Sequence, residues 1–144
     1  QQLRPQILAL RPGTRVVSHM WDMGEWEPDE KVSTDDSQAF LWIVPAPVAG
    51  RWRLAEEDGT SFGELELVQR FQRVGGTLCL RGRTQPLLGA FVNGATLGFT
   101  FVDPFGAVRT LRAQVAGDTM AGRTNFVGTT APVTGRRVAA AAPP

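Results

Sequence analysis

Closely spaced glycine, asparagine and aspartate residues after position 48 limit what this chain can fold into. Eleven of the 16 glycines follow residue 74, and the runs between these residues are short and alternate. In the run from Glu64 to Phe71, Leu65 and Leu67 share one side with Gln69 and Phe71. Half-buried antiparallel strands have this period of two. The sequence therefore predicts an antiparallel meander.

We expect this meander to form a mainly β domain over residues 48–140, a small closed barrel of about eight strands. Closure removes exposed sheet edges. Asn93–Gly94 and Gly117–Asp118 are typical hairpin turns, which favours sequential connections. Residues 141–144 are predicted to be a frayed tail. The expected strands are about Gly50–Glu56, Gly63–Val74, Thr77–Arg81, Leu87–Val92, Thr96–Val102, Val108–Ala116, Thr119–Phe126 and Thr134–Ala139.

Residues 1–47 form the other predicted domain, which begins with a helix. Leu3, Ile7 and Leu8 lie near helical spacing, and the Leu-Arg-Pro-Gly sequence at residues 10–13 is a typical helix stop. This helix begins without a capping residue. We therefore expect that further residues precede it in the natural protein.

Buried strands are predicted after this helix. Thr14–Ser18 contains the adjacent Val16 and Val17, as in strands buried on both faces of a parallel sheet. An acidic, aromatic loop follows, with a short strand near Lys31–Ser33. Ala39–Val44 is a continuous apolar run that ends at prolines, which indicates a buried strand before a linker.

Charge and composition exclude several classes of protein. Residues 1–72 hold 12 acids and 7 bases, a net −5, and residues 73–144 hold 2 acids and 8 bases, a net +6. The arginines of the basic half are scattered between glycines, so we expect no nucleic-acid partner. No apolar run of about 18 residues and no leader is present, so we expect a cytoplasmic protein without a membrane span. Cys79 is the only cysteine and is expected to be buried and inert, with a reactive thiol as the alternative.

The chain has few groups for catalysis. It contains one histidine, one cysteine and no tyrosine, and no second histidine or cysteine lies at metal-ligand spacing, so we expect neither a catalytic residue nor a metal. Ser18 points away from His19 across a strand, which makes them a poor catalytic pair. His19 is instead placed at the carboxyl end of a predicted strand, where open α/β sheets bind ligands, and Asp22 and Trp26 would overhang the same crevice. A structural histidine is the alternative.

Residues 50–53, Gly-Arg-Trp-Arg, resemble the Gly-x-Trp entry of lipocalin-like barrels, in which the tryptophan plugs one end. This resemblance implies a binding module whose cavity takes a small apolar ligand. Side chains of the ordinary core are the alternative. The candidate cavity residues are Trp52, Gln69, Phe71, Phe99 and Phe101.

Several strings resemble class I S-adenosylmethionine-dependent methyltransferases. LRPGTRVV at residues 10–17 is similar to their late L-K/R-P-G-x-R-x-V element, which leads into the fifth strand of a doubly wound sheet. VSHMWDMGEWEPD at 17–29 and AFLWIVPAPVAGRW at 39–52 resemble a bacterial subfamily, in which a β-rich domain follows. LVQRFQRVGG at 67–76 is similar to a pattern of that domain.

The resemblance implies that residues 1–47 are a helix-strand-strand remnant of the catalytic sheet and that the barrel is an accessory, substrate-directing domain. We expect the barrel to cover the crevice near His19. The intact family binds S-adenosylmethionine through a glycine-rich turn and an acidic residue, and neither is in this chain. The chain alone is therefore expected to bind no cofactor and to be inactive.

The resemblance also implies a partner. Without the rest of the sheet, Val16, Val17, Trp42 and Ile43 would lose cover, and each large apolar side chain left exposed forgoes about 1.5–3 kcal/mol. The missing amino-terminal methyltransferase domain would supply the cover, or a homodimer would. A protein-interaction module that uses the stretch from Trp21 to Trp42 is a further alternative.

Overall fold

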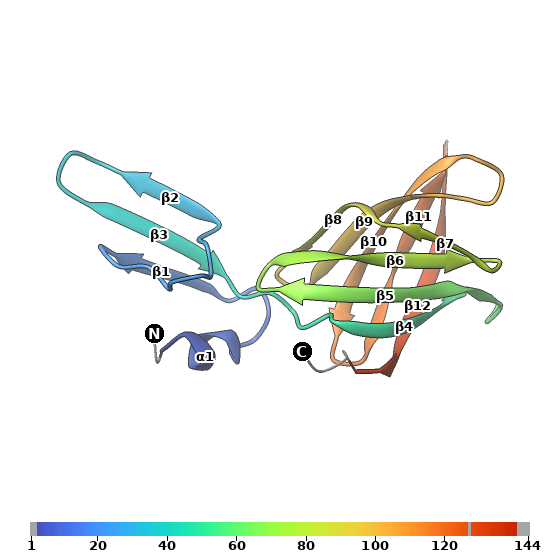
Figure 1. Ribbon diagram of the computed structural model, residues 1–144, viewed down its shortest axis with the longest axis horizontal. Helices are drawn as coiled ribbons and strands as arrows, with labels where there is room; N and C mark the ends of the chain where they lie inside the picture. The colour runs from blue at the N-terminus through green and yellow to red at the C-terminus, as the bar shows by residue number, and fades with distance from the viewer. Residues whose placement is uncertain (1–2, 127, 141–144) are drawn as a thin grey trace.

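The computed structural model describes residues 3–126 and 128–140, and the tail predicted at 141–144 lies outside them. Two sheets are arranged end to end, a small one on the left of Figure 1 and a larger one on the right. The small sheet has three strands in the order β1-β3-β2, with a short helix packed below it. Its elements are α1 (Leu3–Leu8), β1 (Arg15–His19), β2 (Glu30–Ser33) and β3 (Gln38–Ile43).

The larger sheet is a nearly closed antiparallel barrel, as the alternating pattern predicts. Its nine strands run in the order β7-β6-β5-β4-β12-β11-β10-β9-β8, so sequence neighbours are mostly neighbours in space. They are β4 (Gly50–Glu56), β5 (Ser61–Arg70), β6 (Arg73–Leu80), β7 (Arg83–Pro86), β8 (Leu88–Asn93), β9 (Thr96–Val102), β10 (Val108–Ala116), β11 (Thr119–Phe126) and β12 (Thr129–Ala139).

The barrel has nine strands and not the expected eight because the sequence pattern does not indicate one short strand, and one strand boundary also differs. The turn between β5 and β6 lies at Phe71–Gln72, inside the strand predicted over 63–74, and Phe71 has φ 57°. The glycine pair expected to separate these strands lies within β6 instead. A Cβ at Gly76 would clash with the Glu66 carbonyl oxygen, so this glycine permits a close approach of strands. The missed strand is β7, whose four residues carry little alternation.

The interior of the barrel is filled by its own side chains. Inward residues alternate with exposed ones along β4, where Trp52 and Leu54 are buried, and along β10, where Leu111 and Ala113 are buried. Burial of each large apolar side chain contributes about 1.5–3 kcal/mol. The cluster comprises Ala46, Val48, Trp52, Leu54, Leu65, Leu67, Leu78, Leu80, Val92, Leu97, Phe99, Phe101, Leu111, Ala113, Val115, Met120 and Val133.

A side chain helps to close the seam between the two ends of the large sheet. β8 ends its pairing with β9 at Leu88 opposite Thr100, which leaves the last residues of β9 without a strand on that side. The Gln85 amide donates to the Val102 carbonyl at 2.7 Å and accepts from the Val102 N–H at 2.9 Å. The Gln85 side chain thereby takes the place of a neighbouring strand as the hydrogen-bond partner of the Val102 N–H and C=O groups.

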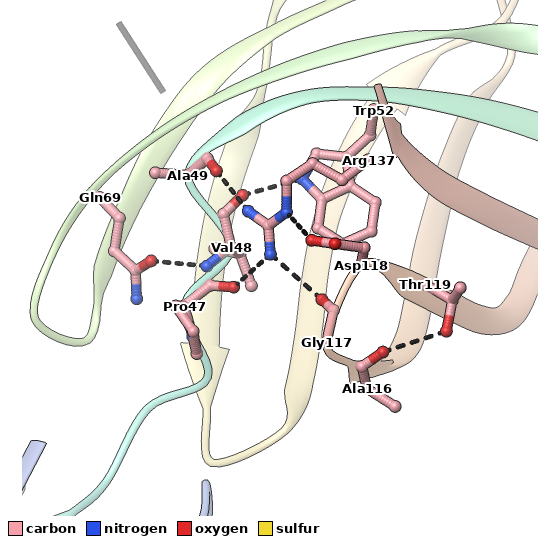
Figure 2. A network of polar contacts seen from close by, with 10 residues as sticks. All are labelled: Pro47, Val48, Ala49, Trp52, Gln69, Ala116, Gly117, Asp118, Thr119 and Arg137. Carbon is pink, nitrogen blue, oxygen red and sulfur yellow. Dashed lines mark hydrogen bonds and ion pairs between the residues drawn. The ribbon is translucent and has the colours of Figure 1, made fainter. Parts of the chain in front are cut away.

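One end of the barrel is plugged by a tryptophan and an arginine (Figure 2). The Trp52 indole is fully buried and donates to the Val48 carbonyl at 2.8 Å. The Arg137 guanidinium lies over this ring, 4.5 Å from its centroid. Its N–H groups donate to the carbonyls of Ala49, Pro47 and Gly117 and to the Asp118 carboxylate. Arg137 thus joins the linker, the first and last barrel strands and the β10–β11 turn.

Both pairings of the small sheet are antiparallel, whereas the adjacent valines predict a strand of a parallel sheet at 14–18. Val16 lies opposite Trp42 on one face, and Val17 lies opposite Leu41 on the other. The first face packs against α1 and the loop of residues 20–29. No described element covers the second face, where Val17 is 70% exposed.

We predict that Arg137→Ala lowers the free energy of unfolding by about 2–4 kcal/mol, because it removes several hydrogen bonds to backbone carbonyls and the cover of a buried indole. Urea denaturation followed by tryptophan fluorescence measures this. Arg136→Ala is the control on the same strand, because Arg136 is exposed, and it should change the free energy by at most about 0.5 kcal/mol. Equal losses in both variants would contradict the role of Arg137.

Candidate functional site

The four predicted crevice residues do not converge on one site. Ser18 is buried and its hydroxyl donates to the Trp21 carbonyl at 2.7 Å, so it fixes the start of the loop. His19 is exposed, and Asp22 accepts a local hydrogen bond from the Gly24 N–H. Trp26 is fully buried. Of these residues, only the exposed His19 and Asp22 are open to solvent.

The barrel does not cover His19, contrary to the sequence-based expectation. Arg15 pairs with Ile43, which directly precedes the linker, while His19 pairs with Ala39 at the other end of the small sheet. β1 therefore runs away from the barrel, as Figure 1 shows. The barrel instead contacts the loop of residues 20–29, which returns beneath the sheet.

An aromatic cluster joins this loop to the barrel, and we call it the junction cluster: Trp26, Trp42 and Phe71. Trp26 lies 6.2 Å from Trp42 and stacks on Phe71 at 5.9 Å, measured between ring centroids. The Trp42 indole donates to the Trp26 carbonyl at 3.0 Å. Phe71 is the tip of the β5–β6 hairpin, so this hairpin links the two sheets.

Charged side chains surround the junction cluster. The acidic loop supplies Glu25, which pairs with Arg70 at 2.8 Å, and Glu27, which pairs with Arg73. Gln72 donates to the Glu27 carbonyl at 2.8 Å. These pairs are exposed, and each contributes at most about 1 kcal/mol. The acidity of the loop is thus matched to the basic hairpin tip.

The five predicted cavity residues lie in three separate places. Trp52 and Gln69 belong to the plugged end, where the Gln69 amide accepts from the Val48 N–H and donates to two carbonyls. Phe71 lies outside the barrel in the junction cluster. Phe99 and Phe101 are buried on the inner wall of β9.

The described part of the barrel has a pocket of about 460 Å³ at its other end, which we call the mouth pocket. Phe101 forms its floor, and Phe62 packs edge-on against Phe101 with centroids 5.9 Å apart. Arg109 lines it from β10 and donates to the Thr124 hydroxyl at 2.8 Å and to the Asn125 carbonyl at 3.3 Å.

Sequence reasoning found only Phe101 among these residues. Arg109 was detectable, since it shares the inward register of Leu111 and Ala113 on β10. Phe62 was not, because the register shifts between Leu54 and Ala55 where β4 meets β5, and the period of two is interrupted there.

The loops around the mouth pocket are held by their own carboxylates. Asp103 accepts from the N–H groups of Phe105 and Ala107, each at 2.9 Å. The backbone N–H of Thr60 and then its side chain lower the pKa of Asp58. Because this pKa is lowered in the folded state, the ionised Asp58 stabilises its loop at neutral pH and the effect is lost as pH falls through the lowered pKa.

The arrangement is suited to binding. Among residues 3–126 and 128–140, no three His, Cys, Asp or Glu side chains are grouped so that they could hold a metal ion. Cys79 is half-buried. The mouth pocket is lined by acidic and basic side chains, among them Glu56, Asp103, Arg81 and Arg109, together with apolar ones, as in sites that hold a small molecule.

Comparisons with known proteins identify no relative: no family model, no curated protein and no solved structure matches this chain. No helix in the described part of the chain is long and apolar enough to cross a membrane.

We predict that Phe71→Asn destabilises the protein by about 1–3 kcal/mol and shifts tryptophan emission to longer wavelength. Asparagine tolerates the positive φ at this position but removes the ring that covers Trp26. Urea denaturation and steady-state fluorescence measure both effects. Val68→Ala, on the exposed side of the neighbouring strand β5, should leave both unchanged. Unchanged emission from Phe71→Asn would show that the hairpin tip does not dock as described.

Proposed function

We propose that the chain is the carboxyl-terminal segment of a protein resembling class I S-adenosylmethionine-dependent methyltransferases, with the barrel as an accessory, substrate-directing domain. The segment would contribute the last strands of the catalytic sheet and no cofactor site. Alone, it would not transfer methyl groups. The uncovered face of the small sheet is the observation that carries this proposal.

This face lies open to solvent and carries exposed apolar side chains next to charged ones. Val17 and Val32 are 70% and 62% exposed. Val17 lies opposite Leu41 and Val32 lies opposite Ala39, and the other neighbour of Leu41 is Glu30. Sheets of α/β proteins are covered on both faces, and their strands are apolar on both sides for that reason. A sheet of this composition with one bare face is therefore suited to a further layer of structure.

The outer edge of β1 supports the same proposal. β3 occupies one side of β1, and no described strand pairs with the other. An edge of this kind presents unpaired N–H and C=O groups that can accept another strand. A parallel strand of a catalytic sheet would extend the small sheet at this edge. It would then lie next to β1, which belongs to the sequence strings that resemble the methyltransferases.

The barrel would act on the substrate through the loop of residues 20–29. This loop follows β1, at whose carboxyl end open α/β sheets bind ligands. The β5–β6 hairpin fixes the loop through Phe71 and two ion pairs. The barrel would therefore direct the substrate by holding Asp22 and its neighbours in place.

Calorimetric titration with S-adenosylmethionine tests the proposal. We expect no heat of binding with this chain and saturable binding of one molecule per chain with the product of the complete reading frame. The first result follows from the absence of a glycine-rich strand-turn-helix in this sequence. Tight binding by this chain alone, or no binding by the complete product, would contradict the proposal.

A homodimer is the alternative way to cover the bare face. In the isolated chain we expect a concentration-dependent dimer in sedimentation equilibrium, because apolar surface of this kind associates when its partner is absent. Val17→Lys should shift the chain to monomer, and Val68→Lys, on the barrel surface, should not. A folded monomer at every concentration would show that the face needs no cover.

A further inference from the structure

The outer surface of the barrel carries an open groove of about 710 Å³ over β4, β12, β11 and β10, which we call the basic groove. Arg53 and Arg136 line it, and no acid is among its described lining residues. Small side chains make up much of the remaining lining and leave room above the strands. They are Ala55, Ala116, Thr119, Ala121 and Thr134, of which all but the half-buried Ala55 are exposed.

The two arginines of the basic groove form a like-charge pair. Arg53 and Arg136 are both exposed and lie directly opposite each other on β4 and β12, an arrangement that destabilises a sheet. Neither makes an ion pair within residues 3–126 and 128–140. Glu64 lies opposite Arg53 on β5, on the side of β4 away from the groove, and can balance one charge. The neighbours of Arg136 are Arg53 and Thr119, so the second charge is not balanced.

The neighbouring strands add no negative charge to this face. β10, β11 and β12 contain no acid. Asp118, in the turn between β10 and β11, is paired with Arg137 at 2.8 Å. Arg112 and Arg123 form a second like-charge pair on β10 and β11. A carboxylate that compensates the basic groove must therefore come from another part of the protein or from a partner.

The small sheet presents two adjacent carboxylates in the turn between β2 and β3, which we call the acidic turn (residues 34–37). Asp35 and Asp36 are exposed and make no ion pair with any residue that the structure describes. The Thr34 N–H donates to the Ser37 carbonyl at 2.8 Å, and the hydroxyls of these two residues lie 3.2 Å apart. The turn is thus held by its own ends.

The acidic turn and the basic groove of one chain cannot meet. Ser33 pairs with Gln38 at one end of β3, and Ile43, at the other end, precedes the linker to the barrel. Figure 1 accordingly shows the β2–β3 turn at the end of the small sheet farthest from the barrel. A contact between turn and groove must therefore join two chains.

We propose that the basic groove receives the acidic turn of a second copy of this chain, with the carboxylates of Asp35 and Asp36 paired to Arg53 and Arg136. Guanidinium and carboxylate groups form charge-assisted hydrogen bonds of matching geometry. The contact is head-to-tail, so it builds an open chain or a ring of copies. It uses neither the bare face of the small sheet nor the methyltransferase-like origin. A nucleic acid fits less well, because the groove lining contains no aromatic side chain on which bases stack.

Two complementary variants test this contact by NMR. Asp35→Asn with Asp36→Asn keeps the groove and removes the charges of the turn, and Arg53→Gln with Arg136→Gln does the reverse. Neither variant joins to itself through this contact, but a mixture restores one contact per pair. Addition of the unlabelled groove variant to the labelled turn variant should cause saturable shifts in the amide resonances of the groove. Raising NaCl from about 0.05 to about 0.5 M should weaken this binding about tenfold or more.

The matched control changes net charge equally at another place. When the labelled turn variant also carries Arg53→Gln and Arg136→Gln, the shifts at Ala121 and Thr134 should disappear. When it carries Arg81→Gln and Arg83→Gln instead, they should remain, because these exposed arginines lie at the β6–β7 turn. Equal loss in both would show a non-specific charge effect and would overturn the proposal.

The same spectra distinguish the other occupants. Shifts confined to the bare face, at Val17 and Val32, would show that the chains associate there and would overturn the proposal. An oligothymidylate should shift the groove amides only at higher concentration than the second chain does. The opposite order would assign the groove to a nucleic acid, and the absence of groove shifts with either would show that it is no docking surface.

Discussion

The stacking of Arg137 on Trp52 is the contact on which the rest of the barrel depends. A barrel with two open ends exposes its apolar interior at both, and the indole closes one of them. Arg137 carries its charge on an aromatic face and places its N–H groups against carbonyls of the linker and the β10–β11 turn. Because these carbonyls lie where strands end, no neighbouring strand satisfies them. One side chain thus fixes four segments that are distant in sequence.

Because one end is closed and the other is open, the two ends of the barrel differ in what they can contact. The linker from the small sheet enters at the plugged end, and the β5–β6 hairpin leaves that end to reach Trp26. Attachment to the small sheet therefore uses the plugged end, and the mouth pocket remains open on the opposite side.

The sequence predicts the mainly β fold because each inward position of a half-buried strand must be apolar, and this requirement is local. It does not predict the β5–β6 turn correctly, since a glycine pair indicates a turn as readily as the close strand approach that Gly76 permits. The site was harder to predict. Trp52 lies near the start of β4, and Gln69 and Phe71 lie where β5 ends and its turn begins, so all three lie away from the mouth. Phe62 and Arg109 come together only through strand pairing over long sequence separations.

The acidic loop has a counterpart of opposite charge in the structure. The acidic loop of residues 20–29 lies against the basic tip of the β5–β6 hairpin, where Glu25 and Glu27 pair with Arg70 and Arg73. Such exposed pairs add little stability, but they impose an orientation on the aromatic stack of Trp26 and Phe71 that hydrophobic burial alone does not specify. The aromatic stack supplies the stabilising free energy of this contact, and the ion pairs fix its orientation. The orientation of the barrel relative to the small sheet therefore depends on ion pairs that contribute little to the stability of the fold.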